Sequence, residues 1–315
     1  MAAIIRDYVP RDAEPVSGLL REVHPYLVMT PRIVHVQVTG APARQHYRLL
    51  VAQEAGRITG CVRAGLFADS SDPEAAFANV AVRAADRRRG AGGALLAAAE
   101  AHLAEVGATT FYAWAEDGPD AHDFATRRGY RPGRHASFLR LDLHAGTAPP
   151  GDPLPARPTL PPGVRLVRAA LWAHDPRPLY EADVECFRDE PGDIPADGIS
   201  YADWRAVTWD RPDFDPDLST VALVDGEVAG LVLVQTDGAD RYWSGGTGVR
   251  PAHRGLGLAK AAKAHSLTLA RALGFREAFT SNDAGNAAML AVNRWLGYQP
   301  CGSERRYIRD LTDRS

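Results

Sequence analysis

The stretch Val249-Arg-Pro-Ala-His-Arg-Gly-Leu-Gly-Leu-Ala259 decides the fold, because the chain carries it twice. Its counterpart in the first half is Val82-Arg-Ala-Ala-Asp-Arg-Arg-Arg-Gly-Ala-Gly92. Apolar residues at helical spacing follow each copy, and each predicted helix ends at a glycine, Gly107 or Gly274. Two glycine-rich loops in the same context indicate an internal duplication.

The segments around the two loops also repeat in the same order. Matching segments predict a β-hairpin (Val51–Gly60 and Val221–Gly230), a short strand (Thr109–Trp114 and Glu277–Thr280) and a final strand (Ser137–Leu143 and Arg306–Leu311). The hairpins make each half a mixed sheet and not a doubly wound parallel one. The sequence therefore predicts an α/β fold of two tandem halves.

The boundary between the halves is a proline-rich segment. Residues 145–163 include seven prolines, which exclude a helix or a central strand. We therefore predict a first domain over residues 1–145, a linker over 146–163 and a second domain over 164–315. Each half is long enough to bury its own core.

Composition narrows the class of protein. The 315 residues carry a net charge of −3, so no global basic field favours nucleic acid as a partner. No apolar run approaches the roughly 18 residues of a membrane span, and the N-terminus lacks the pattern of an export signal. Cys61, Cys186 and Cys301 are too few and too widely spaced for a disulfide framework or a cysteine zinc site. The ten histidines form no HxxxH pair. We expect a cytoplasmic protein without a metal or a membrane partner.

Each glycine-rich loop has the outline of a phosphate site. Backbone N–H groups at a helix N-terminus attract an anion, glycine permits close approach, and arginine adds a charged contact. Neither loop has the GxxxxGK[ST] pattern of a P-loop or the complete GxGxxG of a dinucleotide fold. The run Trp243-Ser-Gly-Gly246 also lacks the GxSxG elbow of a serine hydrolase.

At this point the residues carry a resemblance to a known family. The pattern V-x-P-x-x-R-G-x-G-x-A at Val249–Ala259 resembles the acyl-CoA pyrophosphate loop, [RQ]-x-x-G-x-[GA], of the GCN5-related N-acetyltransferase (GNAT) superfamily. The series N-x-x-x-N-x-x-M-x-x-x-N over Asn282–Asn293 is similar to its fourth-helix region. The similarity is greatest to tandem-domain members common in actinobacteria, including mycothiol-synthase-like proteins. It implies two tandem GNAT-fold domains, each a mixed, mostly antiparallel sheet flanked by helices.

The resemblance also implies acetyl-CoA, or another acyl-CoA, as the donor. The implied donor-binding residues are Gly248, Val249, Arg254, Gly255, Leu256, Gly257, Leu258, Ala259, Asn282, Asn286 and Asn293 in the second half, and Val82, Arg87, Arg88, Arg89, Gly90, Ala91, Gly92 and Gly93 in the first. A backbone N–H near Gly248 or Val249 would stabilise the oxyanion of the reacting thioester. The three asparagines suit the amide-rich pantetheine arm, but capping and turn formation explain them equally well.

The family's catalytic acid and base cannot be transferred to this chain. In many relatives a carboxylate on the fourth strand is the base, whereas the matching segments here are Ser244–Thr247 and Phe77–Val80. The tyrosine that acts as the acid in those relatives is replaced by Asn293 in the second half and by Ala125 in the first. The catalytic residues are therefore unknown at this stage.

The second half has the longer acceptor region, which makes it the favoured catalytic half. The stretch Glu181–Asp217 has twelve acidic and three basic residues and five aromatic ones, a composition that suits a small cationic amine. A solvated acidic surface over core aromatics is an equally ordinary explanation. Within the stretch, Asp189 and Asp193 resemble a D-x-P-x-G-D run of tandem relatives and are the candidate acceptor contacts.

The resulting prediction is an acetyl-CoA-dependent N-acetyltransferase that acts on a primary amine of a small cationic acceptor, by direct transfer in a ternary complex. Two alternatives remain open. One is an aminoacyl transferase of the same fold that uses charged tRNA, because the first half has a basic region over Arg21–Arg48. The other is a non-catalytic, acyl-CoA-binding regulatory protein, which the missing acid and base favour.

Overall fold

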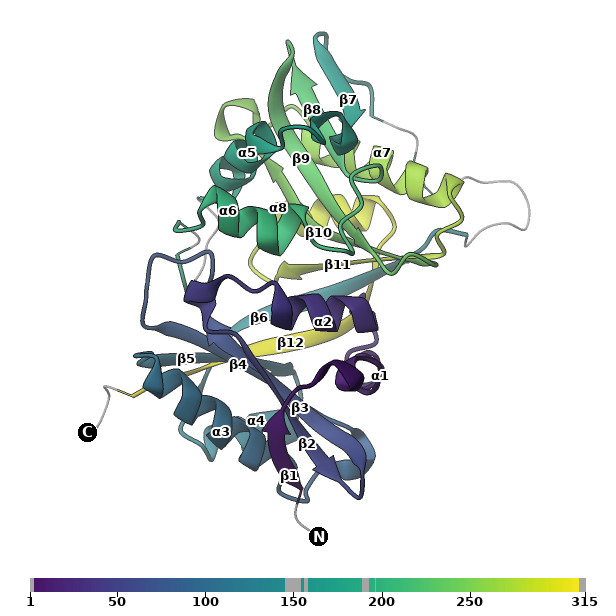
Figure 1. Cartoon of the computed structure of the whole chain (residues 1–315). Helices are drawn as coiled ribbons and strands as arrows, with labels where there is room; N and C mark the ends of the chain where they lie inside the picture. Colours follow the sequence, from purple (N-terminus) through teal and green to yellow (C-terminus); the bar gives the residue numbers. More distant parts are fainter. Residues whose placement is uncertain (1–2, 145–153, 156–157, 189–192, 196, 312–315) are drawn as a thin grey trace. The chain divides into compact units, whose positions relative to one another are not determined.

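The computed structural model describes residues 3–144, 154–155, 158–188, 193–195 and 197–311 (Figure 1). The chain forms two compact units. Unit 1 consists of Met1–Ala136, Asp193–Val207 and Ser303–Ser315, and unit 2 of Ser137–Gly192 and Thr208–Gly302. Much of the predicted linker, residues 146–153 and 156–157, lies outside the described residues.

Unit 1 is a sheet with helices on both faces. Its strands have the order β1-β2-β3-β4-β5-β12. Its elements are β1 (Ile4–Asp7), α1 (Ala13–Val23), α2 (Pro31–Thr39), β2 (Arg48–Glu54), β3 (Arg57–Leu66), β4 (Ala75–Val82), α3 (Ala91–Glu105), β5 (Thr110–Glu116), α4 (Pro119–Thr126), α6 (Tyr201–Trp204) and parts of β6 (Arg131–Asp142) and β12 (Gln299–Asp310). In Figure 1, α3 and α4 lie on one side of the strands and α1 and α2 on the other.

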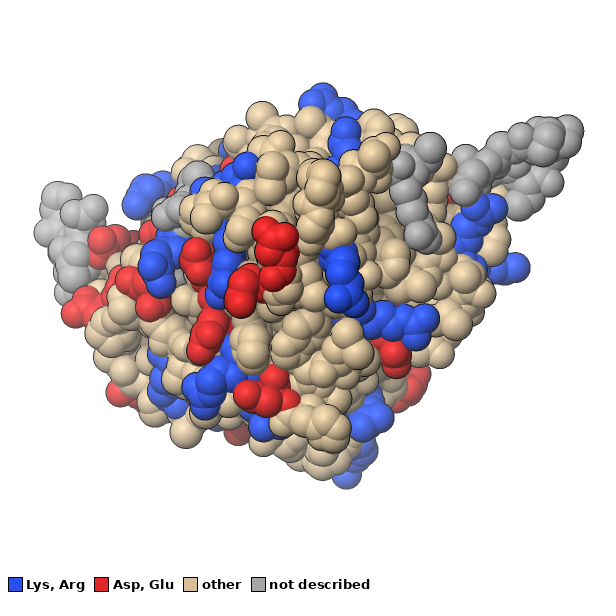
Figure 2. All heavy atoms as spheres, turned by 90° about the horizontal axis from the view of Figure 1, so that it is seen from above, with Lys and Arg blue, Asp and Glu red and all other residues tan. Residues whose placement is uncertain are grey.

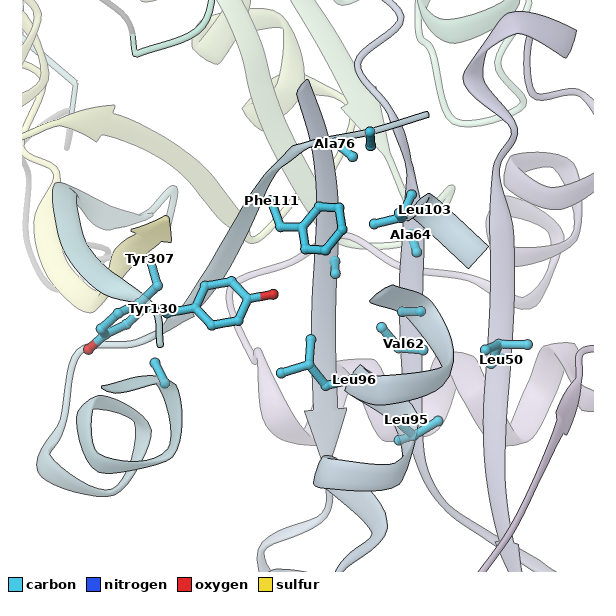
Figure 3. Packing of buried hydrophobic residues seen from close by; sticks show 14 of the residues in the cluster. Leu50, Val62, Ala64, Ala76, Leu95, Leu96, Leu103, Phe111, Tyr130 and Tyr307 are labelled. Carbon is cyan, nitrogen blue, oxygen red and sulfur yellow. The ribbon is translucent and has the colours of Figure 1, made fainter. Parts of the chain in front are cut away.

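The core of unit 1 follows from the alternation of side chains along its strands. Leu50 and Val62 face α3, whereas Leu49 and Cys61, their neighbours in the chain, face α1 and α2. Figure 3 shows the α3 side of this core, with Tyr130 and Tyr307 at one end of the cluster. The labelled residues of the cluster are Leu50, Val62, Ala64, Ala76, Leu95, Leu96, Leu103, Phe111, Tyr130 and Tyr307.

Unit 2 repeats this design. Its strands have the order β6-β11-β10-β9-β8-β7, with α7 packed on one face and α5 on β9 and β10. Its elements are the end of β6, β7 (Val164–Arg168), α5 (Arg177–Phe187), β8 (Thr220–Val224), β9 (Glu227–Thr236), β10 (Arg241–Val249), α7 (Leu258–Ala272), β11 (Glu277–Asp283), α8 (Ala287–Trp295) and the start of β12.

Backbone conformation confirms the duplication. Positive φ values occur at matched positions of the two copies: at the hairpin turns (Gly56 and Gly226), after the long helices (Gly107 and Gly274) and before the final strands (Gly129 and Gly297). The predicted hairpins are β2–β3 and β8–β9, each with a register shift at the same place. The prediction of a mixed, mostly antiparallel α/β fold is confirmed.

The final strands do not follow the predicted domain boundaries. β12, at the end of the second half, pairs antiparallel with β5 of unit 1 over Glu304–Asp310. The end of β6 lies in unit 2, where Leu139 and Leu141 join the core. Each of these strands has 12 residues and extends about 40 Å, long enough for its two ends to belong to different units. Residues 193–207, predicted in the second domain, also belong to unit 1.

In both units a parallel pair of strands separates after three residues. β4 pairs with β5 over Ala75–Phe77, and β10 pairs with β11 over Arg241–Trp243. All four strands continue beyond this pairing. We call the point where the two strands part the opening of each sheet, and the glycine-rich loop follows the first strand of each pair.

The surface carries charges of both signs. On the face drawn in Figure 2, acidic and basic side chains lie beside one another, in keeping with the net charge of −3. Among the described residues, no helix is both long and apolar enough to span a bilayer.

The assignment of β12 to unit 1 predicts which unit loses stability when Tyr307 is truncated. Tyr307 is 1% exposed and packs in the α3 core. We expect Tyr307→Ala to lower the protection of α3 amides from hydrogen exchange by about 3 kcal/mol, and to leave α7 nearly unchanged. Tyr298→Ala in unit 2 is the matched control and should do the reverse. Equal losses in α3 and α7 for Tyr307→Ala would contradict the assignment.

Candidate active site

The two glycine-rich loops have the same backbone conformation. In unit 1, Arg88 and Gly90 have φ values of +64° and +91°, and in unit 2, Gly255 and Gly257 have +82° and +74°. Gly90 and Gly257 are the N-caps of α3 and α7, and neither supplies a side-chain cap. The first-turn amides of both helices are therefore available to an anion. A Cβ at Gly257 would meet no described atom within 4 Å, so this position opens to the outside of the loop.

In each unit, an arginine of the glycine-rich loop donates a hydrogen bond to a backbone carbonyl oxygen at the end of the preceding strand. Arg87 Nε donates to Val82 O at 3.2 Å, and Arg254 Nε donates to Val249 O at 3.2 Å. Arg254 Nη2 also donates to Cys186 O at 3.5 Å. These bonds tie the loop to the end of the preceding strand, so the arginines shape the site as well as add positive charge.

The arginines of the unit 1 loop also meet carboxylates. Arg87 lies 4.0 Å from Glu116, Arg88 pairs with Asp120, and Arg89 lies 3.1 Å from Glu54. All three guanidinium groups are 41–64% exposed, so these ion pairs are weak and a ligand phosphate could compete for them. Gly93 has a different role, since a Cβ there would lie 2.8 Å from Arg128 Nη2.

A cavity of about 640 Å³ opens beside the unit 1 loop. It begins where β4 and β5 separate, and its walls come from these strands and from α3 and α4. The apolar lining includes Ala78, Val80, Leu96, Ala113, Ala115 and Phe124. The loop residues Arg87, Arg88, Gly90, Gly92 and Gly93 form its rim. A slot with an anion-binding rim and an apolar wall fits the elongated shape of an acyl-CoA.

The corresponding strand of unit 2 is distorted at its opening. The register of β10 on β9 shifts between Ser244 and Gly246, a β-bulge, whereas β4 keeps a continuous register on β3. In unit 1 the position of Gly246 is taken by Asn79, whose Oδ1 accepts a hydrogen bond from Trp114 N across the opening. Bulges redirect backbone groups beside active sites. Unit 2 therefore presents a reshaped backbone where unit 1 has a side-chain bridge.

Helix α5 places a carboxylate at the bulge. A Cβ at Gly246 would lie 3.9 Å from Asp183 Oδ1 and 3.5 Å from the Phe187 ring, and Asp183 Oδ1 is itself buried. Gly248 is required for packing as well, since a Cβ there would lie 2.4 Å from that of Cys186. Burial raises the pKa of the Cys186 thiol to about 12, which excludes this thiol as a nucleophile at neutral pH.

The three predicted asparagines have three different roles. Asn286 caps α8, with its Oδ1 accepting from Met289 N at 3.1 Å. Asn293 is fully buried, and both ends of its amide are used, by Lys263 Nζ and by Asn282 Oδ1. Asn282 is partly exposed at the end of β11 and is the one placed to meet a ligand.

The structure describes one of the two acceptor-side candidates. Asp189 lies outside the described residues. Asp193 belongs to unit 1, where it lies 3.8 Å from Arg134 Nε and 3.6 Å from Arg306 Nη1. Other carboxylates of the acidic stretch also have partners: Asp203 with Arg44, Asp197 with Ser71 and Asp213 with Arg211. These described carboxylates of the stretch therefore each have a partner within the protein.

The sequence of each half matches one family of enzymes. Residues 22–130 and 177–298 match the profile of the acetyltransferase (GNAT) family. The chain belongs to this family. This confirms the resemblance on which the two loops were interpreted, and the protein is an N-acetyltransferase of the tandem type.

Individual relatives agree with the family assignment. A mycothiol acetyltransferase of Clavibacter michiganensis is 30% identical over 236 residues, which are 74% of this chain and 72% of the relative. One from Cellulomonas flavigena is 30% identical over 241 residues, 73% of this chain and 66% of the relative.

Solved structures share the fold along the whole chain. A GCN5-related N-acetyltransferase from Sphaerobacter thermophilus has a TM-score of 0.72 at 22% identity, with 98% of this chain and 96% of that chain covered. A tandem GNAT protein from the clavulanic acid biosynthesis pathway has a TM-score of 0.71 at 21% identity, with 98% of both chains covered.

Sequence reasoning did not single out two residues that the structure places near the bulge and the asparagines. Asp183 is one of twelve acidic residues in its stretch, and only the packing of α5 on the bulge distinguishes it. The sequence does mark Lys263 as unusual. It is one of only two lysines in the chain and stands between the apolar Ala262 and Ala264 of a predicted helix.

Burial of Lys263 makes stability depend on pH. Burial lowers the pKa of Lys263 from 10.5 to about 7, so between these values the unfolded chain holds a proton that the folded chain lacks. Folding is then favoured as pH rises. We expect the free energy of unfolding of the native protein, relative to that of Lys263→Met, to increase by up to about 1.4 kcal/mol per pH unit between pH 7 and 10.

Urea unfolding of both proteins at pH 7, 8 and 9 measures this difference. The Tyr298 ring lies 5.4 Å from Lys263 Nζ, and Tyr242 contacts the same helix through Ser266. Burial raises the pKa of both phenols, so they stay neutral in this window. A difference that does not change with pH would contradict the burial of a titrating ammonium.

Proposed function

We propose that the acetyltransferase moves the acetyl group of acetyl-CoA to a primary amine of a small acceptor, in unit 2, by direct transfer in a ternary complex. The observation that carries the proposal is the β10 bulge at Gly246 with Asp183 beside it. A general base must lie within reach of the attacking amine, and this carboxylate is placed at the opening of the sheet.

The donor side is assigned to the loop and slot of unit 2. The first-turn amides of α7 and the positive end of its dipole would hold the pyrophosphate, with Gly257 open in front of them. Asn282 would meet the amide groups of the pantetheine arm between β10 and β11. Acetyl-CoA supplies the acetyl group already activated as a thioester.

The chain's own groups supply the remaining chemistry. Asp183 would take the proton of the acceptor ammonium and so leave a nucleophilic amine. The backbone N–H groups around Gly248 and Val249, at the end of the bulged strand, would stabilise negative charge on the carbonyl oxygen as the C–N bond forms. The adduct would then break its C–S bond and release CoA as the thiolate, which takes up the second proton that the acceptor nitrogen loses. No metal or nucleophilic side chain is required for this direct route.

The relatives and the site support one class of acceptor. The curated relatives carry the name mycothiol acetyltransferase. Amines that are precursors of small thiols are therefore the first acceptors to screen, with aminoglycosides and amino acids as further sets. A carboxylate beside the bulge favours a cationic amine in each set.

Unit 1 is proposed as a second acyl-CoA site without transfer activity. Its loop has the backbone of the unit 2 loop, and its cavity has the size for a pantetheine arm. The Asn79 bridge occupies the place of the bulge.

Titration calorimetry with acetyl-CoA tests both donor sites. We expect Gly257→Glu to abolish one binding event, because its carboxylate would take the place of a phosphate, and Gly90→Glu to abolish the other. Gly257→Ala is the control, since its methyl group has space and it carries the same backbone strain of about 1 kcal/mol without the charge. Unchanged binding in Gly257→Glu would refute the donor assignment in unit 2.

Steady-state kinetics test the base. We expect Asp183→Asn to lower kcat by 100-fold or more, and to leave the affinity for acetyl-CoA within about twofold, since the carboxylate acts on the acceptor. Glu185→Gln, on the same helix but paired with Arg250 at 3.0 Å, is the matched control and should keep most of the activity. An Asp183→Asn enzyme with native kcat would remove Asp183 from the mechanism.

A further inference from the structure

We propose that Lys263 is a positioning residue that acts through Asn293 to hold the Asn282 amide with its N–H donors toward the acyl-CoA slot of unit 2. The inference rests on the proposed donor site in that unit. It assigns a role to a buried charge that the transfer chemistry does not otherwise use.

The three side chains form one connected chain. Lys263, on α7, is fully buried, and its Nζ donates to Asn293 Oδ1 at 2.7 Å. Asn293 Nδ2, on α8, donates to Asn282 Oδ1 on β11. The chain therefore runs from the helical layer to the strand that borders the opening.

The direction of these hydrogen bonds fixes each amide. Lys263 Nζ donates to Asn293 Oδ1, and the protonated amine can only donate, so the atom of Asn293 that faces the charged form of Lys263 is the oxygen. The other end of Asn293 is then the NH2 group, which must face an acceptor, and this places the oxygen of Asn282 toward it. The NH2 group of Asn282 then points away from Asn293. Lys263 sets this orientation indirectly, because it fixes the Asn293 amide, which in turn fixes the Asn282 amide.

The strand geometry shows where the Asn282 amide lies. The last residue of β11 that pairs with β10 is Phe279, so Asn282 stands on the part of β11 that has separated from β10. Unit 1 shows what the same three positions line in the other copy of the fold. Its residues that correspond to Lys263, Asn293 and Asn282 are Leu96, Ala125 and Ala115. All three line the unit 1 cavity.

The comparison also shows that the fold does not need the polar chain. Leu96 and Ala125 are part of an apolar core in unit 1, at the same positions of the same helices. A buried ammonium is costly, and apolar replacements of buried ionic groups are often neutral or stabilising. Orienting a ligand contact is a reason to keep Lys263 in unit 2, and preorganised donors raise affinity by avoiding the cost of ordering them on binding.

Calorimetry with acetyl-CoA in the Gly90→Glu background, which confines titration to unit 2, is the first measurement. We expect Lys263→Met to weaken binding about tenfold, as the loss of one oriented hydrogen bond would. Arg271→Met is the control: it removes one positive charge from the last turn of the same helix, at the opposite end from the glycine-rich loop. Equal weakening by both variants would show a charge effect and overturn the proposal.

A double variant separates orientation from general damage. Asn282→Ala should weaken binding by a similar factor, and Lys263→Met added to it should have little further effect, because the oriented group is already gone. Additive losses would overturn the proposal. If Lys263→Met does not fold, Lys263→Leu, with the residue that unit 1 has at this position, takes its place.

Side-chain NMR of ¹⁵N-asparagine-labelled protein gives a readout independent of binding. We expect a slowly exchanging Asn293 side-chain amide that becomes fast in Lys263→Met, and an unchanged signal would overturn the chain of contacts. If the Gly90→Glu protein binds no acetyl-CoA, the proposed function fails. If it binds, and Asn282→Ala weakens binding while Lys263→Met does not, the present inference alone fails.

Discussion

The separation of two parallel strands after three paired residues is the constraint on which each unit depends. A parallel ladder satisfies its backbone groups only while the strands stay adjacent. Beyond Phe77 in unit 1 and Trp243 in unit 2, the strands part, and something else must meet those groups or leave them open to a ligand. The glycine-rich loop follows directly after the first strand of each pair. An anion site and an opening for an extended molecule are therefore built by the same local geometry.

The two units treat this opening in different ways. In unit 1 the Asn79 side chain reaches across it, and an apolar cavity lies beneath. In unit 2 a bulge at Gly246 replaces the bridge, and Asp183 faces it. A bridging amide uses the backbone donor that an active site would offer to a substrate, whereas a bulge frees such donors. Duplication thus provides two copies of one frame of loop and strands, and the proposed transfer site uses the copy that has the bulge.

Much of this could be predicted because it is local in the sequence. Glycines in left-handed conformation mark hairpins and helix ends, and the spacing of Gly255 and Gly257 identifies the loop within a few residues. The exchange of the last strands could not be predicted, because β6 and β12 have similar patterns and either unit could accept them. The ion partners of Asp193 could not be predicted for the same reason, because Arg134 and Arg306 are remote from it in the sequence. Local sequence patterns predict backbone conformation, whereas the partners of a side chain depend on the tertiary fold.

Lys263 shows how a residue that conflicts with its local pattern can still be informative. Its helix is amphipathic, and a lysine among alanines on the inner face opposes the burial that the helix otherwise provides. Local consistency is broken most often where function requires it. The conflict is met here by one acceptor, Asn293 Oδ1, and by the ring of Tyr298 at 5.4 Å. The corresponding helix in unit 1 has leucine at this position, so the fold itself does not require a buried lysine. We therefore attribute the free-energy cost of burying Lys263 in unit 2 to the proposed site.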